Sequence, residues 1–146
     1  MAAHSTLEFL IDLAVSKSDA AAAGLGKAIR VSEDGSNKLS LLRQYRDNYV
    51  ANFQTSMASG LTASAYRNYQ SFLAKLEQAI AGQDGIVAGL ERKITKERSA
   101  WQESERQRNR YRMLQDRAAQ KVYNTAQQRE QKAMDEHAAR QLFYRR

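Results

Sequence analysis

Few residues in this sequence combine a reactive side chain with spacing that would build a reactive site. His137 lies in the segment DEHAAR next to Asp135 and Glu136, whose side chains are possible metal ligands. Adjacent side chains on a helix point in different directions, so the segment predicts a solvated histidine and no metal site. The chain has no cysteine, which excludes disulfides and thiolate chemistry.

Other catalytic patterns are also missing from the sequence. It contains no glycine-rich phosphate loop, no Cys/His metal-ligand spacing and no strand-turn-helix setting for a nucleophile. Carboxylates are numerous, but two helices packed side by side offer no pocket that would remove a carboxylate pair from water. We therefore predict a protein that is not an enzyme and that needs no cofactor.

The elements that carry these residues are predicted to be long helices. The 146 residues include no proline, which would interrupt a helix by removing a backbone donor. Ser5 and Glu8 in STLE have the spacing of a capping box at the start of a first helix. Gly60 tolerates the positive φ of a reversal, and Thr62 or Ser64 could cap a second helix.

A seven-residue repeat of apolar positions continues along the second helix and is typical of a coiled coil. Its two core rows hold Tyr66, Leu73, Ile80, Val87, Ile94 and Trp101, and Tyr69, Leu76, Gln83 and Leu90. We predict an all-α fold, a long antiparallel two-helix coiled-coil hairpin with a protruding C-terminal helix. It forms one domain over residues 1–146, with helix 1 over about 5–57, a tip at about 58–63 and helix 2 over about 62–140. A three-helix version, broken near Gly35, is the alternative.

The two predicted helices differ in length. At a rise of 1.5 Å per residue, the first is about 70–75 Å long and the second nearly 120 Å. If the chain reverses near residue 58, Ser5 lies opposite roughly residue 112, and the helix beyond that level has no partner within the chain.

Charge is concentrated in the same C-terminal part. Residues 1–90 hold 8 Lys/Arg and 8 Asp/Glu, whereas residues 91–146 hold 15 and 8, which accounts for the net charge of +7. Such a segment can meet nucleic acid, acidic lipid or an acidic protein surface. The chain start lacks a basic leader and no apolar stretch is long enough to span a bilayer, so we expect a soluble cytoplasmic protein.

Some apolar residues are surplus to a narrow coiled-coil core. Phe72 and Ala79 precede the first core row and, with Leu76, widen the apolar surface of helix 2. Leu42, Tyr45 and Tyr49 form a similar ridge on helix 1. These side chains either enlarge the core or form an aromatic–aliphatic patch that docks on another protein.

The chain resembles the FliJ family of the bacterial flagellar type III export apparatus over nearly its whole length. The similarity is strongest in HSTLEFLIDLA near the start, in QYRDNYVANFQTSMASGLTASAYRNYQSFLAKLEQAI across the tip, in LQDR, and in KAMDEHAAR near the end. The resemblance implies a coiled coil that binds the hexameric export ATPase as a stalk and promotes its assembly and activity. It also implies that the protein binds the cytoplasmic part of the export gate protein FlhA and escorts export chaperones. It implies a cytoplasmic protein, peripheral to the inner membrane at the flagellar base, which meets the membrane only through the gate and binds no nucleic acid.

Residue roles follow from the same resemblance. The gate-binding strip of the family corresponds to Leu42, Tyr45, Tyr49, Phe72, Leu76 and Ala79. Lys38 and Gln83 depart from the family pattern, so no role is transferred to them. Insertion of the basic C-terminal helix into the ATPase ring would involve Arg117, Lys121, Arg129, Lys132 and Arg140.

Three other functions fit the same helical pattern. A basic coiled coil that binds nucleic acid would use the C-terminal third, although no helix-turn-helix or basic-region pattern occurs there. A stalk protein of a virulence secretion system or of a rotary ATPase would differ only in its partner. A structural spacer would not need the apolar ridge.

Overall fold

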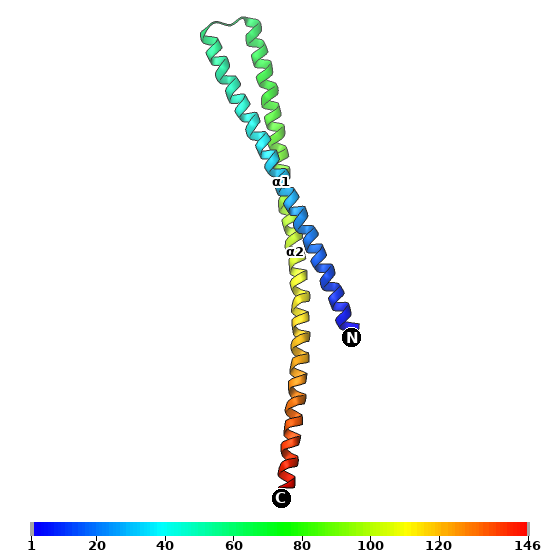
Figure 1. The fold of residues 1–146 in the computed structure, drawn as a ribbon. Coiled ribbons are helices and arrows are strands. Elements are labelled where there is room, and N and C mark those ends of the chain that lie inside the picture. Colours follow the sequence, from blue (N-terminus) through cyan, green and yellow to red (C-terminus); the bar gives the residue numbers. More distant parts are fainter. Residues whose placement is uncertain (1, 146) are drawn as a thin grey trace. The chain divides into compact units, whose positions relative to one another are not determined.

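The computed structural model describes residues 2–145, with side chains placed for residues 5–145. Two helices, α1 (Ala2–Ala58) and α2 (Ala63–Tyr144), account for nearly all of this range (Figure 1). No β-strand occurs within residues 2–145. The predicted all-α fold, in which two long helices form a hairpin and pack against each other, is therefore confirmed.

The start of α1 differs from the sequence-based expectation. The helix begins at Ala2, so Ser5 lies inside the helix and does not cap it, and the predicted capping box is wrong. Alanine has the highest helix propensity of all residues. The alanines at positions 2 and 3 therefore extend the helix past the capping signal.

The helix α1 is uninterrupted, so the three-helix alternative with a break near Gly35 is wrong. Gly35 is buried against α2, and a Cβ atom placed on it would approach Leu90 Cδ1 to 2.9 Å. Glycine weakens a helix by about 1 kcal/mol relative to alanine. Here the close approach of α2 accounts for the glycine, and the packing keeps the residue helical.

The loop between the helices is short and is built as the sequence predicts. Gly60 has φ of 89°, in the left-handed region that glycine enters without a Cβ clash. The Thr62 Oγ1 atom accepts a hydrogen bond of 3.1 Å from the Ala65 main-chain N–H. Thr62 is therefore the N-cap of α2.

The chain forms two compact units, which we describe separately. The tip unit is Asp19–Gln102 and contains the loop. The terminal unit combines α1 up to Ser18 with α2 from Glu103 onward.

In the tip unit, the core follows the heptad repeat along both helices. The buried residues of α1 are small at one end, with Ala28, Ser32 and Gly35, and become larger toward the loop, with Leu39. The buried residues of α2 are Leu76, Ile80 and Val87. The predicted core rows of α2 are thus confirmed here, except that Tyr66 is 43% exposed.

In the terminal unit, α1 packs on α2 through small side chains. Ala14 is buried, and Ser18 is only 2% exposed. The Ser18 hydroxyl donates a hydrogen bond to Glu105 Oε1. Leu10 lies beside Tyr111, where both line a shallow hollow.

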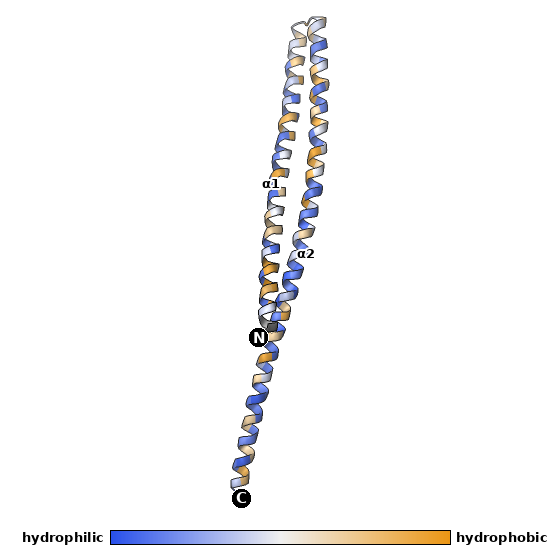
Figure 2. Ribbon diagram, turned by 90° about the vertical axis from the view of Figure 1, so that its right-hand side faces the viewer, coloured by the Kyte–Doolittle hydropathy of each residue, from blue (hydrophilic) through white to orange (hydrophobic). Residues whose placement is uncertain are grey.

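The end of α2 has no helix packed against it within the terminal unit. All residues from 116 to 145 are exposed. Figure 2 shows hydrophilic and hydrophobic residues intermixed along this segment. The prediction that the C-terminal helix extends beyond its partner is confirmed.

Candidate functional site

The predicted apolar surplus lies on one edge of the tip unit, which we call the apolar edge. It comprises Leu42, Tyr45 and Tyr49 on α1 and Phe72, Leu76 and Ala79 on α2. On each helix, these residues occupy one of the two core rows of the heptad repeat or the row that flanks it on the outside. In an antiparallel pair of helices, these rows of the two helices come together at one edge.

Aromatic rings join the two helices across this edge. The ring centroids of Tyr45 and Phe72 are 6.3 Å apart in an edge-to-face arrangement, and Tyr49 lies 4.7 Å from Phe72. The series continues toward the loop, where Tyr69 stacks on Tyr49 at 5.3 Å and on Phe53 at 3.4 Å. Aromatic pairs contribute about 0.5–1.5 kcal/mol beyond their buried area, so the rings hold one another in place.

The residues of the apolar edge differ in how much surface they offer to a partner. Leu76 is 7% exposed and belongs to the same core cluster as Leu39, against which Leu42 packs. Tyr45 is 54% exposed and Phe72 is 38% exposed, although their rings touch. Leu76 therefore belongs to the core between the helices, whereas Tyr45 and Phe72 present exposed aromatic surface.

The other members of the apolar edge and the two residues beside it also differ in exposure. Within the edge, Ala79 is exposed and Tyr49 is half-buried, and Lys38 beside it is exposed. The Gln83 side-chain amide Nε2 donates a hydrogen bond of 3.0 Å to the main-chain oxygen of Gly35. Gln83 is therefore committed to the packing between the helices.

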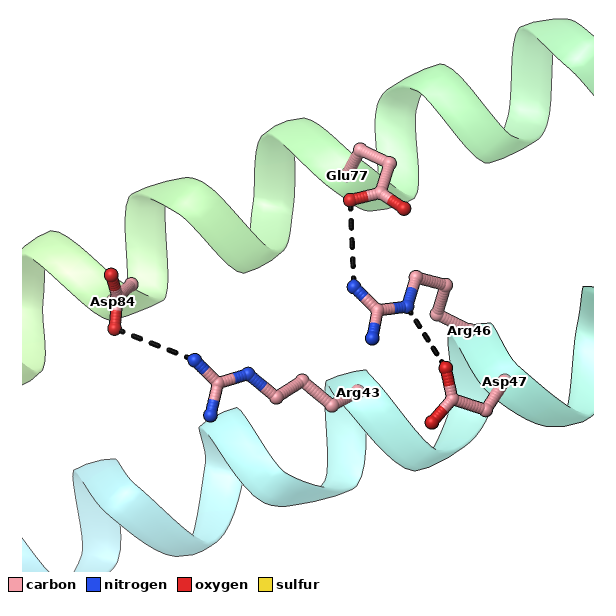
Figure 3. A network of polar contacts seen from close by, with 5 residues as sticks. All are labelled: Arg43, Arg46, Asp47, Glu77 and Asp84. Atoms are coloured by element: carbon pink, nitrogen blue, oxygen red, sulfur yellow. Dashed lines mark hydrogen bonds and ion pairs between the residues drawn. The ribbon is translucent and has the colours of Figure 1, made fainter.

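The opposite edge of the tip unit is charged (Figure 3). Arg43 pairs with Asp84 at 3.7 Å, and Arg46 pairs with Glu77 at 3.6 Å, both from α1 to α2. A hydrogen bond to Asp47, aided by the charges of Asp47 and Glu77, raises the pKa of Arg46 above its ordinary value. Exposed ion pairs contribute only about 0–1 kcal/mol each, so their main effect is to make the two edges chemically different.

The five basic residues predicted for ring insertion lie in the terminal unit, on the exposed end of α2. The structure does not gather them around a pocket. Lys121 and Arg129 border a shallow hollow that also contains Val122 and Thr125. The full set of exposed residues is Arg117, Lys121, Arg129, Lys132 and Arg140.

A polar cluster in the terminal unit was missed in the sequence. Glu105 accepts the hydrogen bond of Ser18 and also pairs with Arg108 at 3.5 Å. The Arg108 Nε atom is buried and has no hydrogen-bond partner. Ser18 occupies a core position of α1, and a polar residue in that register is the signal that could have revealed the cluster.

The part of the chain that the structure describes contains neither a metal-ligating cluster nor a membrane-spanning helix. No group of three or more His, Cys, Asp or Glu side chains there could hold a metal ion. Neither described helix is apolar over a length that would cross a membrane.

Comparisons with known proteins show that the chain is similar to members of one protein family. Residues 3–146 match the family model described as "Flagellar FliJ protein". The chain is 32% identical to a Flagellar FliJ protein of Salmonella typhi over 140 residues, which covers 96% of this chain and 95% of the relative. It is 30% identical to a Flagellar FliJ protein of Escherichia coli (strain K12), with the same two coverages.

Proposed function

Because the chain belongs to the flagellar FliJ protein family, we propose that it is a non-enzymatic component of flagellar protein export. In this proposal the apolar edge docks on the cytoplasmic domain of the export gate protein FlhA. The basic end of α2 enters the hexameric ring of the export ATPase, and the protein escorts export chaperones. It acts at the cytoplasmic face of the inner membrane, and the membrane contact belongs to the gate.

The observation that carries the docking proposal is the exposure of Tyr45 and Phe72. These rings touch across the two helices, yet 54% and 38% of their surfaces remain open. Burying what remains exposed would contribute about 2 kcal/mol per ring at 25 cal/mol per Å². Rigid aromatic side chains of this kind are the usual anchors of protein interfaces.

The aromatic geometry also favours a preformed surface. Phe72 contacts both Tyr45 and Tyr49, and Tyr49 stacks in turn on Tyr69. A side chain held by its neighbours loses little rotamer freedom when it binds. Less of the interaction energy is then offset by ordering.

The proposed ring insertion is supported by the exposed end of α2. Residues 116–145 have no part of α1 packed on them, and an isolated helix is marginally stable in water. Enclosure by a partner would stabilise it. Arginine side chains also form charge-assisted hydrogen bonds with acidic or carbonyl groups on surrounding loops.

Binding to the isolated FlhA cytoplasmic domain tests the docking proposal. We expect the double variant Tyr45→Ala, Phe72→Ala to lose at least about tenfold in affinity, since hot-spot truncations exceed about 1 kcal/mol each. Its helical circular dichroism should stay close to the unmodified level. The matched double variant Arg43→Ala, Asp84→Ala removes an ion pair on the opposite edge and should bind normally.

Loss of helical structure in the aromatic double variant would show that these rings are needed for folding, and it would contradict the proposal. Equal loss of affinity in both double variants would contradict it as well, because the effect would then not belong to one edge. Swimming motility of cells that express each variant gives the corresponding biological readout.

A further inference from the structure

The first part of α1 buries little apolar surface against α2. Within residues 5–18, which we call the strap, only Ala14 and Ser18 are buried. The core of the tip unit, by contrast, includes large side chains such as Leu39 and Ile80. Burial stabilises in proportion to the apolar area removed from water, and alanine contributes a single methyl group. The strap is therefore held on α2 by much less apolar contact than the helices of the tip unit hold each other.

Space also remains between the strap and α2. A hollow of about 200 Å³ is bordered by Ala14 of the strap and by Ser104 and Gln107 of α2. A second hollow, of about 50 Å³, adjoins it beside Tyr111. Atoms that border a void lack packing partners on one side and lose the corresponding dispersion contacts. These hollows further reduce what the strap gains by lying on α2.

The polar cluster at the end of the strap is incompletely satisfied. The buried Ser18 hydroxyl donates to Glu105, which also pairs with Arg108. The Arg108 Nε atom is buried and has no hydrogen-bond partner, and an unsatisfied buried donor destabilises the state that buries it. Water hydrates this atom once the strap leaves. Release of the strap therefore recovers part of its own cost.

The strap covers a row of α2 side chains that continues onto the exposed end of that helix. Ser104 and Tyr111 lie beside the strap and are half-buried. The same heptad row continues as Ala118 and Thr125, which are exposed. With the strap in place, the bare part of α2 begins at residue 116. With the strap released, it would begin near residue 103, where the α2 part of the terminal unit starts.

We propose that the strap is a releasable element, whose residues 5–18 leave α2 together and thereby extend the bare end of α2 from residue 116 back to residue 103. A ring that encloses α2 as a single helix reaches this additional segment only after release. The strap and the ring therefore compete for one row of α2, and the strap regulates how far α2 is inserted. This regulation rests on the proposed insertion of α2 into the ATPase ring, whereas release is a property of the free chain.

Hydrogen exchange of the full chain, with no partner present, tests release. Residues that leave as one unit share one opening equilibrium, so the amides of residues 9–18 should have similar protection factors, at least about a hundredfold below those of residues 28–42. Protection that rises gradually from residue 9 to residue 28 would indicate simple fraying and would overturn the proposal. Protection of the strap equal to that of the tip unit would overturn it as well.

Two matched serine variants test what holds the strap in place. Ser18→Glu puts a bulky carboxylate at a buried position that faces Glu105, so it should lower the protection of the strap about tenfold or more. Ser16→Glu makes the same change at an exposed position and should leave the protection within about twofold. Both variants should keep the protection of the tip unit. Equal behaviour of the two variants, or lost protection in the tip unit, would overturn the proposal.

An apolar replacement of the polar cluster should have the opposite effect. Ser18→Ala combined with Glu105→Leu and Arg108→Leu removes all three polar groups at once, so no buried donor or acceptor is left without a partner. Apolar replacement of buried polar clusters is often stabilising, and the protection of the strap should rise about tenfold or more. Unchanged or lower protection would show that the cluster does not weaken the strap, and would overturn the proposal that the strap is built for release.

ATP turnover by the export ATPase tests the regulation and separates it from the proposed function. Ser18→Glu should reach half-maximal stimulation at a concentration about threefold or more below that of Ser16→Glu, because a larger fraction of the chain is already released. Equal concentrations would overturn the regulation. Absence of stimulation by the unmodified chain would overturn the proposed insertion and the regulation with it, while the exchange measurements decide release on their own.

Discussion

The side-chain amide of Gln83 on α2 donates a hydrogen bond of 3.0 Å to the main-chain oxygen of Gly35 on α1. Gly35 is the place in the tip unit where a side chain on α1 would collide with α2, since a Cβ there would lie 2.9 Å from Leu90 Cδ1. The hydrogen bond and the missing side chain act at the same level. Together they favour one alignment of the two helices.

Replacing Gly35 by leucine tests this close approach. We expect the free energy of unfolding to fall by about 1–3 kcal/mol, the usual range for overpacking. Urea denaturation measures the change. Gly82→Leu is the matched control and should raise stability by about 0.5–1 kcal/mol, because its position is open.

The close approach at Gly35 also predicts how the variant Leu90→Ala combines with Gly35→Leu. Leu90→Ala removes the methyl group that the new side chain would meet. In a double-mutant cycle, Gly35→Leu should cost less in the Leu90→Ala background, with a coupling of about 0.5–3 kcal/mol. Simple additivity of the two changes would show that Leu90 is not the obstacle.

In the terminal unit, replacing Glu105 is expected to cost more stability than replacing Glu103. Glu105→Ala leaves the buried Ser18 hydroxyl and the Arg108 guanidinium without their carboxylate, which should cost about 1–3 kcal/mol. Glu103→Ala removes only an exposed pair with Arg106 and should cost less than about 1 kcal/mol. Chemical denaturation of the two variants compares them, and equal losses would contradict a structural role for the Ser18–Glu105 hydrogen bond.

The cap of α2 makes a local prediction at the loop. Thr62→Ala removes the oxygen that accepts the Ala65 N–H and should lower the free energy of unfolding by about 1 kcal/mol. Thr62→Ser keeps the oxygen and should behave like the unmodified chain. Thermal unfolding followed by circular dichroism distinguishes them, and equal behaviour of the alanine and serine variants would contradict the cap.

Under the proposed insertion into the ATPase ring, this chain promotes ATP turnover by the export ATPase. Lys121→Glu with Arg129→Glu changes two exposed residues, so helicity should be unchanged while that stimulation falls steeply. Arg92→Glu with Arg98→Glu makes the same charge change in the tip unit and should keep the stimulation. ATP turnover is the measurement.

A different result would favour the nucleic-acid alternative. In that case the Lys121→Glu, Arg129→Glu variant would stimulate the ATPase normally but would lose a salt-dependent DNA shift that the unmodified chain produces. Phosphate contacts make such binding fall steeply with salt.

Features that depend on local sequence were predicted well. The helical period, the positive φ of Gly60 and the cap at Thr62 each follow from residues within one or two turns of one another. Ser5 is the exception, because its capping pattern is genuine but the alanines before it extend the helix. Local signals compete, and here the helix propensity of the alanines outweighed the capping signal of Ser5.

The depth to which each side chain of the apolar pattern is buried could not be predicted, because it depends on residues of the other helix. Leu76 and Phe72 both fit the apolar pattern, yet one is 7% exposed and the other 38%. The difference arises because Phe72 meets Tyr45 at the rim, while Leu76 points between the helices beside Leu39. Periodicity identifies the side of a helix, but the rotation of one helix against the other decides how deep each side chain lies.

The difference between the two edges has one more consequence. A protein that recognises aromatic rings on one edge, with ion pairs such as Arg43–Asp84 on the other, can accept the tip unit in a single azimuthal orientation. While docked in this way, the tip unit could not turn about its helix axes. Any rotation of the tip unit would then have to alternate in time with the proposed docking.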